Sequence, residues 1–256
     1  MDRTLNGFVW CELITTDLDA AQAFYGDVVG WRADHAGMEG SDYTIISSGD
    51  IPVGGMMTLP PEACEAGVPT MWMGYVKVDD VDRAAERIAA QGGTIYRAPD
   101  DIPGIGRFAV AADPQGAVFT LFAWASPEPP AAAPNAPGQN GWRELRTSDP
   151  AAACDFYAAM FGWEKGEAFD MGPDGKYQLV GLNGTMFGGV SPMETGMVQP
   201  HWFYYFNVED IDDARRKVEV GGGGITLEPV EVPGSAWIIH CTDPQGAAFG
   251  LVGPRQ

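Results

Sequence analysis

The sequence predicts an α+β fold made of two duplicated domains, and three ordered repeats carry this prediction. The repeated pairs of segments are 10–31 with 142–163, 76–93 with 206–224, and 113–122 with 243–252. Each pair is separated by about 130 residues. Matches in the same order at one offset indicate an internal duplication, which decides the architecture before any single motif does.

The domain boundaries follow from a change in composition near the middle of the 256-residue chain. Residues 126–141 contain five prolines and almost no side chain able to pack in a core. Such a segment is typical of an extended linker. We therefore expect a first domain at 1–125, a Pro/Ala-rich linker at 126–141 and a second domain at 142–256.

Each domain begins with an apolar strand and a capped helix. In the first domain, the strand is expected at 8–15 and the helix starts after Asp17, whose side chain can accept from the first free amides. Asp149 takes this place in the second domain, and Pro150 follows at the favoured first helical position. Glycines Gly30 and Gly162 are expected to end the two helices.

The remaining elements follow the same order twice within a domain. The first domain is expected to continue with strands near 31–36, 43–47 and 53–58, and then with a strand at 71–78, a helix at 81–90 and strands near 94–97, 107–112 and 117–123. The chain would thus hold four modules of the type βαβββ, forming two curved mixed-sheet cavities.

Composition excludes several classes of partner. The formal net charge is −20, which repels a phosphate backbone and an anionic membrane, so neither nucleic acid nor membrane is expected as a partner. No apolar run reaches the length of a bilayer span, and the four cysteines are scattered without a C-x-x-C motif. A reduced, cytoplasmic protein fits best.

Three motifs resemble those of the vicinal oxygen chelate superfamily. They are L-x-x-x-D-x-x-x-A-x-x-F-Y-x-x-x-x-G-W from residue 13, V-x-V-D-D-V-D from residue 76, and D-P-x-G at 113–116. This superfamily includes glyoxalase I, bleomycin-resistance proteins and extradiol dioxygenases. The W-x-E-L tract and the two-domain layout more narrowly resemble the CFP-30B-like proteins of actinobacteria, often labelled glyoxalase-like or hydroxylase.

The resemblance implies where a metal site would lie. The ligand positions of the metal-dependent members correspond here to Trp10, Met73, Thr120, Trp142, Phe203 and Gly250. None of these residues offers the imidazole, carboxylate or thiolate that a divalent transition metal prefers. We therefore expect no metal ligands and no cofactor.

Strand alternation predicts which side chains face the two cavities. The expected ligand-binding residues are Trp10, Met73 and Tyr75 in the first domain, and Trp142, Phe203, Tyr205 and Asn207 in the second. Aromatic and apolar walls with a few polar tips are typical of a site for a small molecule.

Three side chains are candidates for catalysis. Glu12 and Glu144 share a strand face with Trp10 and Trp142, where burial would favour a general base or a group that orients a ligand. The alternative is a structural Glu satisfied by backbone amides, an Arg or a Tyr hydroxyl. His201 stands where the first domain has Met71. It either transfers a proton or forms a hydrogen bond to a ligand, or it is an ordinary histidine at the rim.

Three functions remain open from the sequence. The first is metal-independent binding of a small apolar or aromatic metabolite or antibiotic, similar to the bleomycin-resistance branch, with acid–base chemistry by Glu144 and His201 as an extension. The second is a metal-dependent lyase, isomerase or dioxygenase with a displaced site. The third is a non-enzymatic stress or interaction protein with vestigial cavities. The sequence decides neither turnover nor whether the chain is a monomer or a homodimer.

Overall fold

A computed structural model describes residues 7–37, 42–126, 133 and 135–256 of the chain. Of the predicted linker at 126–141, residues 126, 133 and 135–141 are described, whereas residues 127–132 and 134 lie outside the described residues. None of the helices in these described ranges is long and apolar enough to cross a bilayer.

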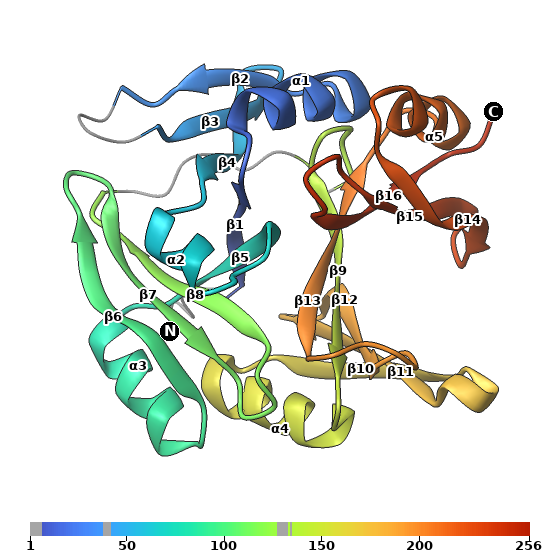
Figure 1. Ribbon diagram of the computed structural model, residues 1–256. Helices are drawn as coiled ribbons and strands as arrows, with labels where there is room; N and C mark the ends of the chain where they lie inside the picture. The colour runs from blue at the N-terminus through green and yellow to red at the C-terminus, as the bar shows by residue number, and fades with distance from the viewer. Residues whose placement is uncertain (1–6, 38–41, 127–132, 134) are drawn as a thin grey trace. The chain divides into compact units, whose positions relative to one another are not determined.

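The strands of the first half form a mixed sheet of eight strands in the order β2-β3-β4-β1-β5-β8-β7-β6 (Figure 1). The strands are β1 (Phe8–Thr15), β2 (Arg32–His35), β3 (Thr44–Ser48), β4 (Ile51–Thr58), β5 (Met71–Lys77), β6 (Thr94–Ile102), β7 (Gly106–Ala112) and β8 (Val118–Trp124). The helices are α1 (Leu18–Val29), α2 (Pro61–Glu65) and α3 (Val81–Ala90). The pairs β1–β4 and β5–β8 are parallel, and the outer pairs are antiparallel.

The second half repeats this order as β10-β11-β12-β9-β13-β16-β15-β14. Its strands are β9 (Asn140–Thr147), β10 (Glu164–Asp170), β11 (Lys176–Leu182), β12 (Thr185–Pro192), β13 (His201–Asn207), β14 (Gly224–Val232), β15 (Ala236–Thr242) and β16 (Ala248–Gly253). Its helices are α4 (Pro150–Phe161), the short 3₁₀ turn η1 (Gly172–Asp174) and α5 (Ile211–Val220). The predicted α+β fold with four βαβββ modules is confirmed.

The predicted helix boundaries are also confirmed. The side chains of Asp17 and Asp149 accept hydrogen bonds from the backbone amides of Ala20 and Ala152, as N-caps do. Gly30 ends α1 with a φ of 84° and Gly162 ends α4 with a φ of 75°. In this left-handed conformation a Cβ is unfavourable, which explains glycine at both positions.

Two elements differ from the prediction. Strand β6 runs to Ile102 rather than ending near residue 97. Its pairing with β7 shifts register between Arg97 and Asp100, so the strand continues beyond Pro99. Since β6 is at the edge of its sheet, it tolerates a proline that cannot donate to the ladder. Helix α2 was not expected; it begins after Pro60, with Pro61 at its first position.

The described residues group into two compact units, each assembled from two modules that are distant in sequence. The first unit contains 7–9, 73–126 and 143–202, and the second contains 10–37, 42–72, 133, 135–142 and 203–256. Helix α3 packs with α4 in the first unit, and α1 packs with α5 in the second. The sequence boundaries at 125 and 142 remain a prediction about the duplicated domains.

The same buried hydrogen-bond network lies in both units. In the first unit, Tyr157 donates its hydroxyl hydrogen to Asp113 and accepts from the indole of Trp202, at 3.1 and 2.9 Å. In the second unit, Tyr25 donates to Asp243 and accepts from Trp72 at the same two distances. The Phe-Tyr and Asp-Pro motifs of the repeat therefore meet inside each unit.

Candidate functional site

Glu144 on β9 is held by two neighbours in the first unit. The hydroxyl of Tyr177 donates to Oε1 of Glu144 at 2.8 Å, and Nη2 of Arg146 lies 3.4 Å from Oε2. Arg146 also lies 3.3 Å from Glu194 through Nη1. The side chain of Arg146 is 8% exposed and that of Glu144 is 13% exposed, so this ion pair is largely shielded from solvent and from screening by salt.

A glycine on the neighbouring strand makes this contact possible. Gly189 of β12 is the direct cross-strand partner of Glu144. A Cβ built on Gly189 would overlap the phenol ring of Tyr177, which lies across the strand at this point. The glycine therefore lets the tyrosine reach over β12 to the carboxylate on β9.

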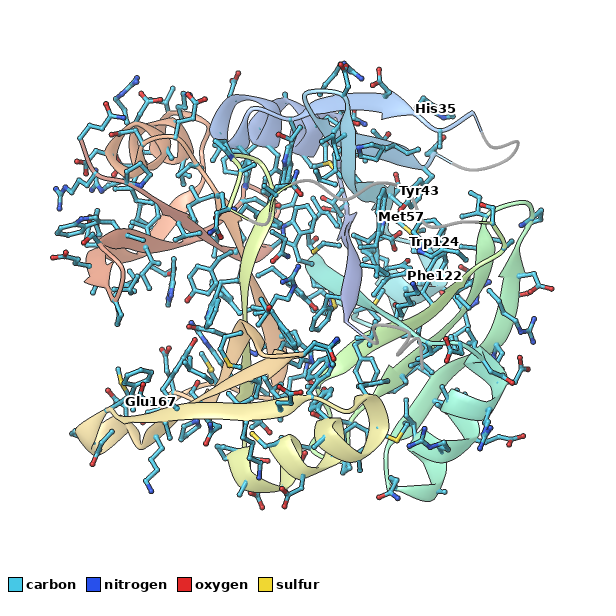
Figure 2. All side chains as sticks on the ribbon, turned by 180° about the vertical axis from the view of Figure 1, so that it is seen from behind. His35, Tyr43, Met57, Phe122, Trp124 and Glu167 are labelled. Atoms are coloured by element: carbon cyan, nitrogen blue, oxygen red, sulfur yellow. The ribbon has the colours of Figure 1, made fainter. Side chains whose placement is uncertain are left out.

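The first domain repeats the arrangement around Glu12 in the second unit. Gly55 of β4 is the cross-strand partner of Glu12, and a Cβ on Gly55 would overlap Tyr43. The indole of Trp10 donates to the hydroxyl of Tyr43 at 2.9 Å. Burial raises the pKa of Tyr43 well above its ordinary value, and the charge of Glu12 together with a hydrogen bond to it adds to this rise. Figure 2 labels Tyr43 beside β3 and β4.

Neither tyrosine was among the site residues predicted from the sequence. A signal in the sequence could have found them. The Gly-Gly pairs at 54–55 and 188–189 are separated by the same number of residues as Tyr43 and Tyr177, so each pair follows its tyrosine at the same distance along the chain. Glycine inside a strand marks a close approach by another group. A tyrosine hydroxyl thus contacts each of the two glutamates, and a role of either carboxylate in catalysis stays a prediction.

His201 joins the group around Glu144 through Arg146. Burial lowers the pKa of His201, and the charge of Arg146 acts in the same direction, whereas Glu194 acts in the opposite one. Its Nδ1 lies 3.3 Å from the carbonyl oxygen of Gln199. A carbonyl only accepts, so Nδ1 carries the hydrogen in this contact and Nε2 is left as a proton acceptor.

These four side chains define what we call the Glu144 group: Glu144, Arg146, Tyr177 and His201. Arg146 was not singled out from the sequence, although it follows Glu144 by two residues and shares its strand face. Its counterpart in the first domain is Ile14, and that of His201 is Met71. The two halves therefore differ in chemistry here: only the second has an arginine and a histidine next to the Glu–Tyr pair.

The other predicted ligand-binding residues of the second domain lie in the second unit. Phe203 and Tyr205 are 4% and 1% exposed, and the hydroxyl of Tyr205 lies 2.8 Å from Nε2 of His240. The amide of Asn207 donates to the carbonyl oxygen of Ala136 at 3.1 Å. Asn207 thereby holds the segment leading into β9, and ligand binding by it stays a prediction.

In the first domain, Met73 and Tyr75 are 6% and 7% exposed. Tyr75 packs against Phe122 of β8, with ring centroids 5.8 Å apart. Trp10 lies with Glu12 in the second unit, as does Trp142 of β9. Glu12 and Glu144 thus belong to different units, and each has its own tyrosine.

The residues at the implied metal positions do not fit a transition metal. Gly250 has no donor, and a Cβ there would overlap the ring of Tyr205, which occupies the space a longer side chain would need. Met73, Thr120 and the aromatic residues at the other positions lack imidazole, carboxylate or thiolate groups. Among the described residues, no three His, Cys, Asp or Glu side chains are placed to hold an ion.

Comparison with known families agrees with the motifs and the module order. The pattern of the Glyoxalase/Bleomycin resistance protein/Dioxygenase superfamily matches residues 7–121 and 141–251. The chain belongs to this superfamily. Both of its duplicated halves are superfamily domains, which confirms the internal duplication.

Two relatives within the superfamily match along nearly their whole length. The anthracycline biosynthesis protein DnrV of Streptomyces peucetius is 34% identical over 262 residues, covering 96% of this chain and 93% of that protein. CFP32 of Mycobacterium tuberculosis is 31% identical over 247 residues, covering 96% and 94%.

Solved structures of the superfamily share the fold. An extradiol ring-cleaving dioxygenase from B. fuscum superposes with a TM-score of 0.68 at 16% identity, covering 99% of this chain and 73% of that one. The Mn(II)-bound glyoxalase from Novosphingobium aromaticivorans gives 0.66 at 15% identity, covering 98% and 83%. At such identities the likeness concerns the fold alone.

Proposed function

We propose that the chain binds a small, largely apolar aromatic metabolite or antibiotic without using a metal, and that the Glu144 group is the polar part of the site. The observation that carries the proposal is the arrangement of Glu144, Arg146 and His201 on one partly buried face. A fixed carboxylate, a guanidinium and a neutral imidazole can orient the oxygen atoms of a ligand, while apolar surroundings supply affinity.

The relatives support the aromatic class of ligand. DnrV and a second protein, DauV of Streptomyces sp. strain C5, are both named for anthracycline biosynthesis, and DauV is 33% identical over 261 residues. Anthracyclines are flat, polycyclic and rich in phenol and carbonyl oxygens. The net charge of −20 favours such a neutral or cationic molecule over a nucleic acid.

Acid–base chemistry is the extension of this proposal. Nε2 of neutral His201 accepts the proton when an acidic O–H or C–H bond of the ligand breaks, and the electron pair stays on the ligand oxygen or conjugated carbonyl. Arg146 stabilises the negative charge that develops. The proton returns from the imidazolium to the product, so the step needs no further reactant.

The first measurement is native mass spectrometry of the purified protein. We expect a metal-free mass, and the spectrum also reports whether the chain is a monomer or a homodimer. A stoichiometric divalent metal would overturn the metal-independent proposal and favour the displaced-site lyase or dioxygenase.

The second measurement is a titration with 1,8-dihydroxyanthraquinone followed by tryptophan fluorescence. In the variant Glu144→Gln we expect the Kd to rise about 10-fold, equal to about 1.4 kcal/mol, because a hydrogen bond to a charged group is lost. Glu228→Gln, which changes an exposed carboxylate paired with Arg215, is the matched control. Unchanged binding in Glu144→Gln, with the fold intact, would favour vestigial cavities; a loss confined to Glu12→Gln would place the site in the first domain.

A further inference from the structure

Glu194 lies on the loop between β12 and β13, in the same unit as the Glu144 group. The backbone amide of Met193 donates to the carbonyl oxygen of Thr147 at 3.0 Å, which fixes the start of this loop to the end of β9. The amide of Met197 donates to the carbonyl oxygen of Glu194 at 3.1 Å, which closes a turn. The loop thereby presents Glu194 to Arg146 of β9.

Arg146 lies between two carboxylates that differ in exposure. Its Nη2 lies 3.4 Å from Glu144, whose side chain is 13% exposed, and its Nη1 lies 3.3 Å from Glu194, whose side chain is 66% exposed. Each terminal nitrogen of the guanidinium thus faces one carboxylate. A ligand carboxylate that bound the guanidinium through two parallel hydrogen bonds would need at least one of these nitrogens. It would therefore have to displace one of the two glutamates.

The balance of charge in the fold does not explain Glu194. Glu144 alone compensates the charge of Arg146, so the three side chains together carry one net negative charge. An ion pair with a partner as exposed as Glu194 contributes little to the free energy of unfolding. We therefore expect Glu194 to act on what approaches the site.

The duplication shows that the loop does not need this ion pair. In the first domain, the loop after β4 starts with the corresponding backbone hydrogen bond, donated by Leu59. Pro60 then stands where the second domain has Glu194, and Ile14 stands where it has Arg146. The guanidinium and its outer carboxylate are thus both present in the second domain and both replaced in the first.

The groups around Arg146 are mainly hydrogen-bond acceptors. The carboxylate oxygens of Glu144 and Glu194 accept, as does Nε2 of neutral His201. Burial lowers the pKa of His201 and the charge of Glu194 opposes this effect, so that charge also acts on the imidazole. Phenolic O–H groups can donate to these acceptors, whereas a further negative charge beside them is repelled.

We propose that Glu194 is a specificity-determining residue, which excludes aromatic carboxylates and restricts the Glu144 group to uncharged molecules that present phenolic O–H groups. This inference rests on the function proposed above, because it concerns the ligand of the same site. It adds the charge of that ligand and the residue that selects it.

The experiment compares two anthraquinones with the same ring system. One is the uncharged 1,8-dihydroxyanthraquinone, and the other is 4,5-dihydroxyanthraquinone-2-carboxylic acid, which carries a carboxylate at neutral pH. The Kd of each for the full-length protein is measured by equilibrium dialysis. We expect the wild type to bind the uncharged molecule at least about 10-fold more tightly. A wild-type preference for the carboxylate would overturn the proposal.

The variant Glu194→Gln removes the repulsion and leaves Nη1 of Arg146 to the ligand carboxylate. It should therefore reduce the preference for the uncharged molecule by about 10-fold. Glu194→Asp keeps the charge and should retain the preference. Glu228→Gln is the matched control, because it removes a carboxylate that is 68% exposed and paired with Arg215. An equal reduction in Glu228→Gln would show that the net charge of the protein, and not Glu194, selects the ligand.

The outcomes separate this inference from the function on which it rests. If both molecules bind and Glu194→Gln leaves their ratio unchanged, the role of Glu194 is wrong while the proposed function stands. If neither molecule binds the wild type or Glu194→Gln, the proposed function falls and the role of Glu194 falls with it.

Discussion

The hydroxyl of Tyr157 lies 3.1 Å from Oδ2 of Asp113, although 44 residues separate them in the chain. The other carboxylate oxygen of Asp113 accepts from three successive backbone amides of its own turn, at residues 115, 116 and 117. One buried side chain thus both shapes the turn before β8 and anchors helix α4. The pair Tyr25 and Asp243 makes the same connection in the second unit.

The first prediction concerns the stability that this contact provides. In Tyr157→Phe, Oδ2 of Asp113 loses the donor and the indole of Trp202 loses its acceptor, both in a buried setting. We expect the free energy of unfolding to fall by about 1–3 kcal/mol, measured by urea denaturation. Tyr25→Phe should behave alike. Tyr96→Phe, at a side chain that is 65% exposed, is the control with little change; an equal loss there would show that the network is not the cause.

The second prediction follows from the pKa of Asp113. Burial raises this pKa, so the folded protein holds the proton more tightly than the unfolded chain. The stability that protonated Asp113 contributes is fully present below its unfolded pKa of about 3.9. It is lost as the pH rises through the pKa of Asp113 in the folded protein. Asp113→Asn should remove this part of the pH dependence.

The check is the free energy of unfolding measured at several pH values between about 4 and 7. The difference between wild type and Asp113→Asn should change across the acidic end of this range and level off toward neutrality. Asp243→Asn, whose carboxyl pKa is also raised by burial, is the matched variant in the second unit. If the difference in unfolding free energy between wild type and Asp113→Asn were constant across this pH range, the raised pKa of Asp113 would be contradicted.

Local sequence signals predicted the module order because each signal acts within a few residues. An N-cap such as Asp149 bonds an amide three positions away, and Gly162 acts on the turn where it stands. Strand alternation likewise placed Glu144 on a face with Trp142. None of these inferences required knowledge of which segments become neighbours in space.

What the sequence did not predict depends on cross-strand register and on packing between distant modules. Tyr177 reaches Glu144 only because β11, β12 and β9 align so that Gly189 lies between them. The grouping of modules into units depends on contacts such as that of Tyr25 with Asp243, across 218 residues. Strand alternation alone, by contrast, could have found Arg146, which follows Glu144 by two residues.

The third prediction concerns His201. Burial lowers its pKa, so the folded state disfavours the charged imidazolium. The stability that His201 contributes is fully present at pH values above its unfolded pKa of about 6.5. It is lost as the pH falls from there through the folded pKa. Between these two pKa values, the free energy of unfolding should therefore fall further in the wild type than in His201→Gln as the pH is lowered.

Ligand binding offers an independent check on His201. If Nε2 accepts a proton from the ligand, the affinity for dihydroxyanthraquinone should stay constant as the pH drops through about 6.5 and weaken only below the folded pKa. His201→Gln should remove this weakening. A midpoint at or above about 6.5 would show that the imidazole is not shielded as the structure indicates.

The last prediction tests why Gly189 is a glycine. Its φ is not in the left-handed region, so alanine is acceptable to the backbone, and the expected cost comes only from overlap of the new Cβ with the Tyr177 ring. We expect Gly189→Ala to lower the free energy of unfolding by about 1–3 kcal/mol through this overpacking. It should also weaken ligand binding, because the displaced ring no longer holds Glu144.

A double-mutant cycle distinguishes overlap with the Tyr177 ring from a requirement of the strand itself for glycine at position 189. In a Tyr177→Ala background the ring is gone, so Gly189→Ala should then cost little, and the two changes should be non-additive by more than about 0.5 kcal/mol. Gly55→Ala with Tyr43→Ala repeats the cycle at the Glu12 pair, where the same overlap exists. Additive costs in both cycles would mean that each glycine serves the strand itself, and the tyrosine would then reach its carboxylate for some other reason.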